Sequence, residues 1–83
     1  MSTIRVSIPR ELWPSRSDWR GKVIDVKIRP GDKVSPGDPL VEIEIEKAVI
    51  VLESDYEGLV REVFVRKGDY VKPGDLVALI ESS

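Results

Sequence analysis

The side chains able to do chemistry in this 83-residue chain are restricted, because it contains neither cysteine nor histidine. Thiol nucleophiles, imidazole bases, disulfides and the usual zinc ligands are therefore excluded. Lysine amines remain, and Lys47 is distinguished by lying between two segments that favour β-structure. A lysine at the tip of a rigid hairpin is suited to carrying a covalently attached group, because the strands fix its Cα atom while the four-carbon stem extends into solvent.

The two segments beside Lys47 have the character of paired strands. Residues 41–46 alternate apolar residues with glutamate, and residues 48–52 are rich in β-branched side chains. The chain is expected to reverse at Glu46 and Lys47. Neither residue is Gly, Asn or Asp, which primed two-residue turns prefer. Type I geometry accepts most residues, so the reversal is permitted, but its prediction depends on the flanking strands and on the repeat.

This predicted hairpin lies between two copies of one sequence unit. Residues 21–44 align with residues 58–81 without a gap, and about half of the positions are identical. Each unit reads as an alternating strand, a Gly-Asp turn, a short valine-centred segment, a Pro-Gly-Asp turn and a closing apolar strand, residues 40–45 or 76–80. We interpret these turns as structural. Their acidic residues do not follow the spacing of a calcium-binding EF-hand loop, so no metal site is expected.

The length and turn density predict the fold class. A chain of 83 residues is long enough for one domain, covering residues 1–83, and too short for two. Turns at this density leave no room for a helix, and two units of this size cannot each bury a core alone. We therefore expect an all-β flattened barrel or sandwich of two quasi-symmetric halves, with Lys47 on a β-hairpin tip.

Composition excludes several kinds of partner. The net charge is −2, and basic residues are not gathered into a run with interleaved aromatics, so nucleic acid is not an expected partner. The sequence has no apolar stretch near the ~20 residues of a membrane helix, and its N-terminus lacks the apolar core of a secretory signal. We expect an intracellular protein, monomeric as an isolated domain, without a membrane partner.

A set of residues spread over both units resembles a known family pattern. The set comprises Gly31, Asp32, Val34, Leu40, Ile43, Glu44, Lys47-Ala48, Ser54, Gly58, Val60 and Gly68-Asp69-Val71. Over residues 21–81 the chain resembles the lipoyl domains of 2-oxo acid dehydrogenase complexes, which belong to the biotinyl/lipoyl attachment family. The resemblance implies that Lys47 bears the cofactor, supported by Glu44, Glu46 and Ala48.

The flanks of Lys47 bear on which cofactor is carried. Biotin carrier domains usually place methionine on both sides of the lysine, whereas lipoyl domains favour a Glu-x-Asp-Lys-Ala string. Here Glu44 to Ala48 fits the lipoyl string, with Glu46 in place of Asp. The resemblance therefore implies covalent lipoate, with biotin as the alternative. Glu44 and Glu46 either orient the arm and mark it for the ligase or are plain strand-face charges.

The resemblance also implies a mechanism and its partners. After attachment by a lipoate-protein ligase, the domain would be a swinging arm that moves acyl groups and reducing equivalents between active sites. Those sites belong to a 2-oxo acid decarboxylase, an acyltransferase and dihydrolipoamide dehydrogenase. The domain itself would be no enzyme, although a place within a dihydrolipoamide acyltransferase fits as well as a free-standing protein. A cytoplasmic location is expected, or the mitochondrial matrix for a domain excised from a eukaryotic precursor.

Two further questions stay open at the level of sequence. A biotin carboxyl carrier domain and an unmodified interaction or structural module are the alternatives to a lipoyl carrier. The loop of residues 13–20 is longer than is usual in the family, and it contains Trp13 and Trp19. These tryptophans either form a docking surface for partners or close one end of the core.

Overall fold

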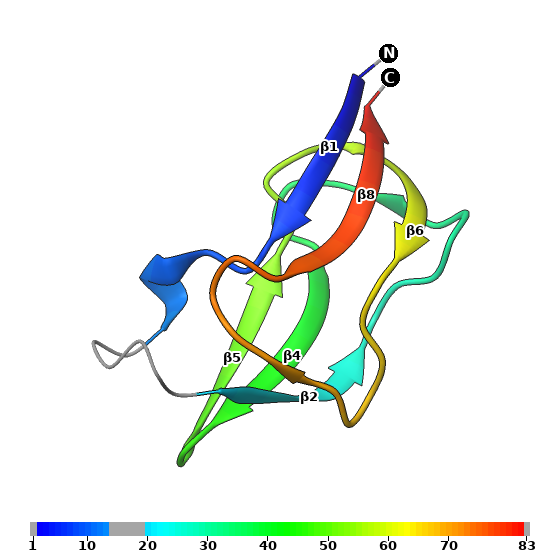
Figure 1. Cartoon of the computed structure of the whole chain (residues 1–83). Coiled ribbons are helices and arrows are strands. Elements are labelled where there is room, and N and C mark those ends of the chain that lie inside the picture. Colours follow the sequence, from blue (N-terminus) through cyan, green and yellow to red (C-terminus); the bar gives the residue numbers. More distant parts are fainter. Residues whose placement is uncertain (1, 14–19, 83) are drawn as a thin grey trace.

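The computed structural model describes residues 2–13 and 20–82, and these residues form mainly β-strands joined by tight turns (Figure 1). The elements are β1 (Ser2–Ser7), a 3-10 turn η1 (Arg10–Leu12), β2 (Gly21–Val26), β3 (Lys33–Val34), β4 (Pro39–Ile45), β5 (Ala48–Glu53), β6 (Gly58–Val63), β7 (Tyr70–Val71) and β8 (Leu76–Ser82). Within the described ranges there is no α-helix, and hence none that could cross a membrane.

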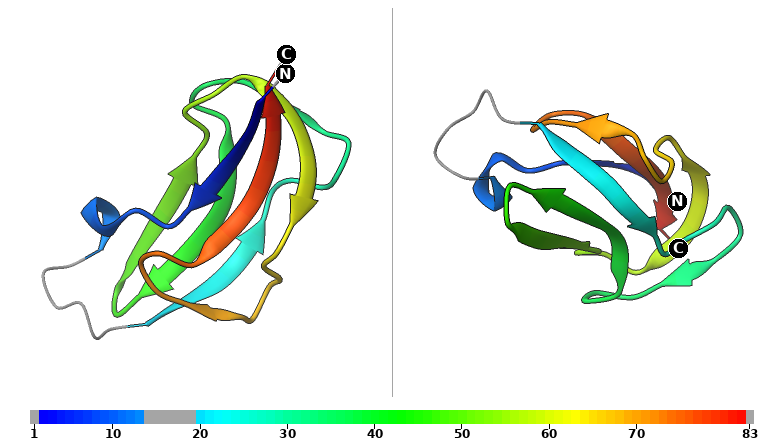
Figure 2. Two further views of the ribbon diagram at one scale, coloured as in Figure 1. Left: turned by 45° about the horizontal axis from the view of Figure 1, so that its top comes forward. Right: turned by 90° about the horizontal axis from the view of Figure 1, so that it is seen from below.

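The strands form two four-stranded antiparallel sheets, in the orders β1-β8-β6-β3 and β5-β4-β2-β7. The sheets lie face to face in a sandwich (Figure 2). The first sequence unit supplies β2, β3 and β4, and the second supplies β6, β7 and β8, but the short strands β3 and β7 each join the sheet of the other unit. The predicted all-β fold of two quasi-symmetric halves is confirmed, as a sandwich whose sheets do not close into a barrel.

The turns predicted from the Gly-Asp motifs are present in both halves. Gly31 has a φ of 98°, which a residue without Cβ adopts readily, and the Asp32 carboxylate accepts a hydrogen bond from the Arg29 N–H at 2.9 Å. In the Pro-Gly-Asp turn, the Asp38 carboxylate accepts from the Ser35 N–H at 2.8 Å. The second half repeats these contacts at Asp69 and Asp75. These glycines and aspartates therefore build the fold, as the sequence predicts.

Backbone hydrogen bonds at the Gly-Asp turns link the two halves to each other. Each turn both donates to and accepts from a residue in the first strand of the other unit. The bonds run from Gly31 N–H to Val60 O at 2.8 Å, Val60 N–H to Asp32 O at 2.8 Å, Gly68 N–H to Val23 O at 2.7 Å and Val23 N–H to Asp69 O at 2.8 Å. The halves are thus interlocked by reciprocal main-chain contacts.

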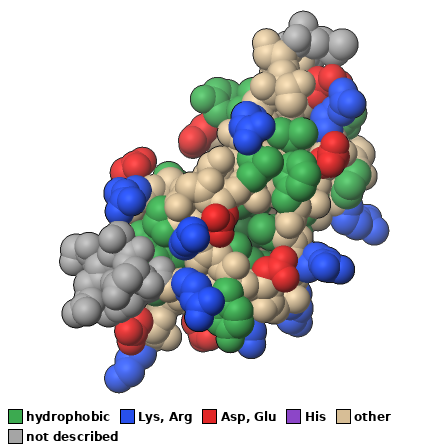
Figure 3. All heavy atoms as spheres, in the orientation of Figure 1, with side chains coloured by type: hydrophobic (Ala, Val, Ile, Leu, Met, Phe, Trp, Pro, Cys, Tyr) green, Lys and Arg blue, Asp and Glu red, His purple; other side chains and the backbone are tan. Residues whose placement is uncertain are grey.

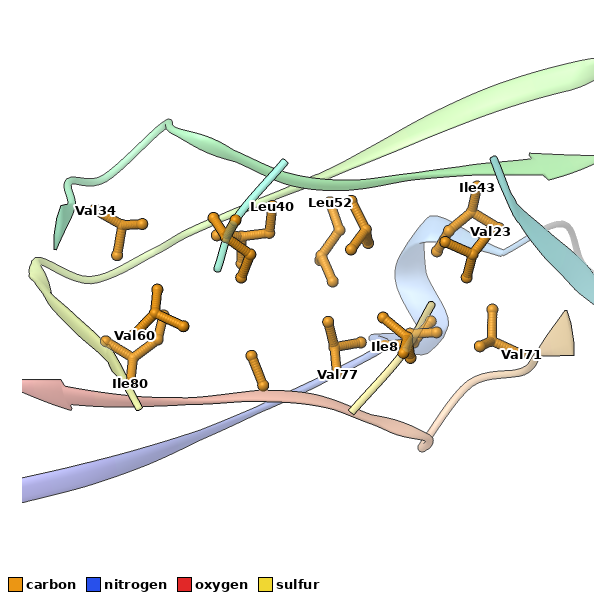
Figure 4. Close-up of a cluster of buried hydrophobic side chains, with 14 of the residues drawn as sticks. Ile8, Val23, Val34, Leu40, Ile43, Leu52, Val60, Val71, Val77 and Ile80 are labelled. Carbon is orange, nitrogen blue, oxygen red and sulfur yellow. The ribbon is translucent and has the colours of Figure 1, made fainter. Parts of the chain in front are cut away.

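The core is a layer of aliphatic side chains between the sheets. Figure 4 shows Leu40 and Leu52 of one sheet pointing toward Val77 and Ile80 of the other. Leu40, Val77 and Ile80 are completely buried. Because aliphatic side chains pack densely and have no polar atoms to satisfy, burial of this layer is the main stabilising contribution in a chain without disulfides.

Strand β5 has a structural twin that the sequence repeat did not reveal. Ser54, which follows β5, donates its N–H to Asp38 O at 2.9 Å and accepts from the Gly37 N–H. Ile8, which follows β1, makes the same two bonds in the second half, to Asp75 O at 2.9 Å and from the Gly74 N–H. Strand β1 therefore has the place in the second half that β5 has in the first. The segment between the units has its counterpart at the start of the chain.

We predict that Gly58→Ala destabilises the domain by about 1–3 kcal/mol through overpacking. A Cβ atom at residue 58 would lie 2.5 Å from the Glu81 carbonyl oxygen and 2.7 Å from Ile80 Cγ2. Urea unfolding monitored by circular dichroism measures the loss. Gly31→Asn is the comparison: nothing lies within 4 Å of that position, so a loss there comes from its φ of +98° and not from packing. A loss below about 1 kcal/mol in Gly58→Ala would contradict the packing explanation.

Candidate functional site

Lys47 lies at the tip of the β4–β5 hairpin. Ile45 pairs with Ala48 across the two strands, so the loop consists of Glu46 and Lys47 alone. In Figures 1 and 2 this tip is at one end of the molecule, and the paired ends of β1 and β8 are at the other. The molecule extends 36 Å along its longest axis. The predicted position of the lysine on a hairpin tip is confirmed.

The conformation of this turn differs from the type I geometry that the sequence permits. Glu46 has a φ of +55°, and Lys47 is not in the positive-φ region. Type I turns have negative φ at both central residues, so the φ of Glu46 excludes type I and is that of the first loop residue in the primed hairpin turns. The physical reason is the twist of the strands: primed turns match it, whereas a type I turn would splay β4 from β5. Strand pairing has prevailed over the local preference of glutamate.

The side chains around the tip are open to solvent. Lys47, Glu44, Glu46 and Ala48 are all exposed. Within residues 2–13 and 20–82, the side chains of Lys47, Glu44 and Glu46 have no hydrogen-bonding or ion-pair partner. The Lys47 amine is therefore accessible to a modifying enzyme and held by no competing contact. The structure brings together all four residues predicted for the site, while the roles of the two glutamates stay a prediction.

Beneath the tip, the core ends in a contact between Trp13, Gly21 and Ile45. Trp13 and Ile45 are both buried. A Cβ atom on Gly21 would lie 3.0 Å from both Ile45 Cγ1 and Trp13 Cη2. The indole therefore packs under the last residue of β4 before the turn. Trp13 closes the core, and the alternative of Trp13 as a docking residue was wrong; Trp19 lies outside the described residues.

The charges with shifted pKa values are distant from the lysine along the strands. The Lys27 ammonium lies 2.8 Å from the Asp25 carboxylate and 3.9 Å from that of Glu42. The hydrogen bond from Lys27 lowers the pKa of Asp25, and the same bond raises the pKa of Lys27. Asp25 of β2 pairs with Glu42 of β4, Lys27 directly follows β2, and all three side chains are partly exposed. We assign this cluster, which sequence reasoning missed, to the sheet surface and not to the site. Basic and acidic side chains are interspersed over the face of the molecule that Figure 3 shows.

A cofactor at this tip would be held by a covalent bond and not by a pocket. A surface hollow of about 390 Å³ is lined by residues including Lys33, Val34, Gly58 and Leu59, at the opposite end of the molecule. In the part of the chain that the structure describes, no three acidic residues converge as a potential metal site. A primary amine on a rigid tip is suited to amide formation with a carboxylic acid, and this is the chemistry that the arrangement offers.

Comparison with known proteins agrees with this geometry. A model of the biotin/lipoyl family, described as "biotin-requiring enzyme", matches residues 15–80. The chain belongs to the biotin/lipoyl attachment family. Its structure is similar to the solution structure of the lipoyl domain of the 2-oxoglutarate dehydrogenase complex from Azotobacter vinelandii, with 27% identity and a TM-score of 0.72 over 96% of this chain and 99% of that chain. No curated protein matches the chain.

Membership of the biotin/lipoyl attachment family establishes the general role of the domain. The family consists of carrier domains that hold lipoate or biotin covalently and are not themselves catalytic. The resemblance to lipoyl domains inferred from the sequence is therefore confirmed. Of the two cofactors, the solved neighbour favours lipoate.

We predict that Glu46→Asn stabilises the domain by about 0.5–1 kcal/mol. The left-handed conformation costs an ordinary residue about 1–2 kcal/mol, and Asn is among the residues that tolerate it. Thermal and urea unfolding of the unmodified protein measure the gain. Glu46→Ala removes the same charge without relieving the backbone, so it is the matched control. A gain of equal size in the alanine variant would show that charge, and not backbone strain, is responsible.

We predict that Trp13→Ala destabilises the domain by about 3–5 kcal/mol, as expected for truncating a buried aromatic residue. Trp13→Phe keeps an aromatic ring beneath Ile45 and is expected to lose less. Denaturant unfolding provides the measurement, and the phenylalanine variant keeps it informative if the alanine variant does not fold. A loss below 1 kcal/mol in Trp13→Ala would contradict the role of the indole as the end of the core.

Proposed function

We propose that Lys47 is lipoylated and that the domain is the swinging-arm carrier of a 2-oxo acid dehydrogenase complex. The observation that carries this proposal is the position of Lys47 at the tip of a two-residue hairpin, exposed and without a partner in the described part of the chain. Such a residue can be presented to several enzymes in turn. The similarity to a 2-oxoglutarate dehydrogenase lipoyl domain supports the same function.

The residues present fit covalent attachment of lipoate. Nζ of Lys47 would form an amide with the carboxyl group of lipoic acid, with overall loss of water, in a reaction catalysed by a lipoate-protein ligase. The dithiolane supplies redox-active and acyl-accepting sulfurs, which this cysteine-free chain lacks. Attachment removes the positive charge of Lys47, so Glu44 and Glu46 would make the modified tip more acidic.

The flanking residues favour lipoate over biotin. Glu46 and Ala48 stand where biotin carriers usually have methionine, and the solved neighbour is a lipoyl domain. The enzymes served would be a 2-oxo acid decarboxylase, an acyltransferase and dihydrolipoamide dehydrogenase. The domain contributes reach, because tethering a reactive group near several active sites raises its local concentration to about the millimolar range.

We predict that incubation with lipoate, ATP and a lipoate-protein ligase adds the mass of one lipoyl group to the intact chain. Lys47→Arg keeps the positive charge but cannot form the amide, so its mass should stay unchanged. Lys33→Arg alters another exposed lysine, at the far end of the molecule, and should be modified like the wild type. Intact-mass spectrometry compares the three proteins.

Different results in the same assay would contradict the proposal in different ways. A parallel incubation with biotin and a biotin ligase tests the alternative cofactor, and a mass increase there alone would identify a biotin carrier domain. Modification of Lys47→Arg would show that a different residue is the attachment site. No increase with either acid would indicate an unmodified interaction or structural module.

A further inference from the structure

The outer side of β5 exposes two valines next to the proposed attachment site. Val49 is 55% exposed and Val51 is 39% exposed, and both follow Lys47 at the two-residue spacing of side chains on one face of a strand. Exposed β-branched residues at an edge strand favour unwanted pairing, and such edges commonly carry charges instead. Strand β5 is at the edge of its sheet and has no charged residue from Ala48 to Leu52.

The twin strand β1 shows that the fold does not require these valines. In β5, Val49 pairs with Glu44 and Val51 pairs with Glu42. In β1, Thr3 pairs with Glu81 and Arg5 pairs with Leu79. Since Glu44 and Glu81 are equivalent in the repeat, Thr3 and Arg5 occupy the twin positions of the two valines. The same architecture therefore accepts a hydroxyl and a guanidinium there. Of the two equivalent strands, only β5, which directly follows Lys47, has apolar residues at these two exposed positions.

The row of valines leads to a small hollow on the surface. Val51 lines it together with Pro9, Leu12, Leu52, Glu53 and Asp55, and its volume is about 190 Å³. A water molecule takes about 30 Å³ in the liquid, so this hollow has room for a five-membered ring. Pro9 precedes the 3-10 turn that leads into Trp13, and Leu12 is the last residue of that turn. The exposed valines thus lead from the tip, along β5, to a hollow formed with the N-terminal segment, whose lining is part apolar and part polar.

The length of a lipoyl-lysine arm matches the length of this apolar row. Val51 is four residues beyond Lys47, which corresponds to about 13 Å along a strand. About eleven bonds separate the Lys47 Cα atom from the dithiolane ring. An extended chain advances roughly 1.2 Å per bond, so the arm spans about 13 Å. An arm folded back over β5 would bring its ring to Val51 and the hollow.

We propose that Val49, Val51 and the hollow beside Leu12 form a resting seat for the lipoyl arm. This inference rests on the proposed lipoylation of Lys47. The valines remove part of the alkyl chain and ring from water between transfers, because burial of apolar surface is favourable. The seat is shallow and open, so the arm leaves it readily. The domain would thereby shield the sulfurs of the free carrier without a closed pocket.

Methyl NMR of the modified and unmodified protein tests the seat. Lipoylation is expected to shift the methyl signals of Val49, Val51 and Leu12 and to give cross-relaxation between these methyl groups and the ring protons. Reduced arm thiols should react with iodoacetamide at least threefold faster in the double variant Val49→Thr, Val51→Thr than in the wild type. Leu59→Thr, at a residue 38% exposed at the opposite end of the molecule, should react at the wild-type rate.

The outcomes separate failure of the seat from failure of the proposed function. The intact mass is recorded first, and a chain that lipoate does not modify overturns the attachment and the seat together. A fully modified chain with unchanged valine signals and equal alkylation rates overturns the seat alone. Valine shifts that change with protein concentration in the unmodified chain would assign this surface to contacts between copies, and would also overturn the seat.

Discussion

The fold depends on the reciprocal hydrogen bonds by which the Gly-Asp turn of each half closes on the first strand of the other. Gly31 and Gly68 donate across the molecule to Val60 and Val23, and both glycines have positive φ in their turns. Main-chain groups buried between strands must be paired, so these bonds determine which sheet the following short strand joins. Because β3 and β7 each belong to the sheet of the other half, neither half has a complete sheet alone. The position of the β4–β5 hairpin follows from this interlock, because β4 is paired to β2 within the same framework.

The site arises where the two quasi-symmetric halves differ. At one end of the molecule, Ile45 and Ala48 are joined through a two-residue loop, and at the other end the equivalent strands finish as the pair Ser2 and Ser82. The segment after β1 adds a second difference, because it brings Trp13 close to Ile45. In the other half, the residue equivalent to Ile45 is the smaller Ser82. The lysine end therefore contains a buried aromatic residue beneath the last residue of β4. A rigid support for a flexible side chain is the arrangement that a carrier needs.

The parts of this structure that sequence reasoning predicted are those governed by local chemistry. Glycine and aspartate at fixed offsets define the turns, and alternation defines the strands, so the repeat, the sandwich and the tip position of Lys47 follow from the residues. What could not be predicted depends on partners distant in sequence. Strand β8 continues to Ser82, beyond the expected end at residue 80, because β1 pairs with it along its length. The equivalence of β1 and β5 was also missed, since their shared signal is little more than Ile4 and Val6 matching Ile50 and Leu52.

The fold maintains an unfavourable backbone conformation at Glu46, next to the proposed attachment site. A glutamate at φ +55° is unfavourable alone, and it persists because the pairing of β4 with β5 and the buried anchor of Ile45 over Trp13 determine the turn on both sides. The same strand twist that imposes this φ fixes the Lys47 Cα atom. Nothing in the described part of the chain then restrains the lysine side chain beyond its Cα atom. The two-residue turn of the twisted hairpin thus fixes the backbone of Lys47 and leaves its side chain unrestrained. An ordinary lysine becomes a candidate attachment site through this placement, and not through any alteration of its own chemistry.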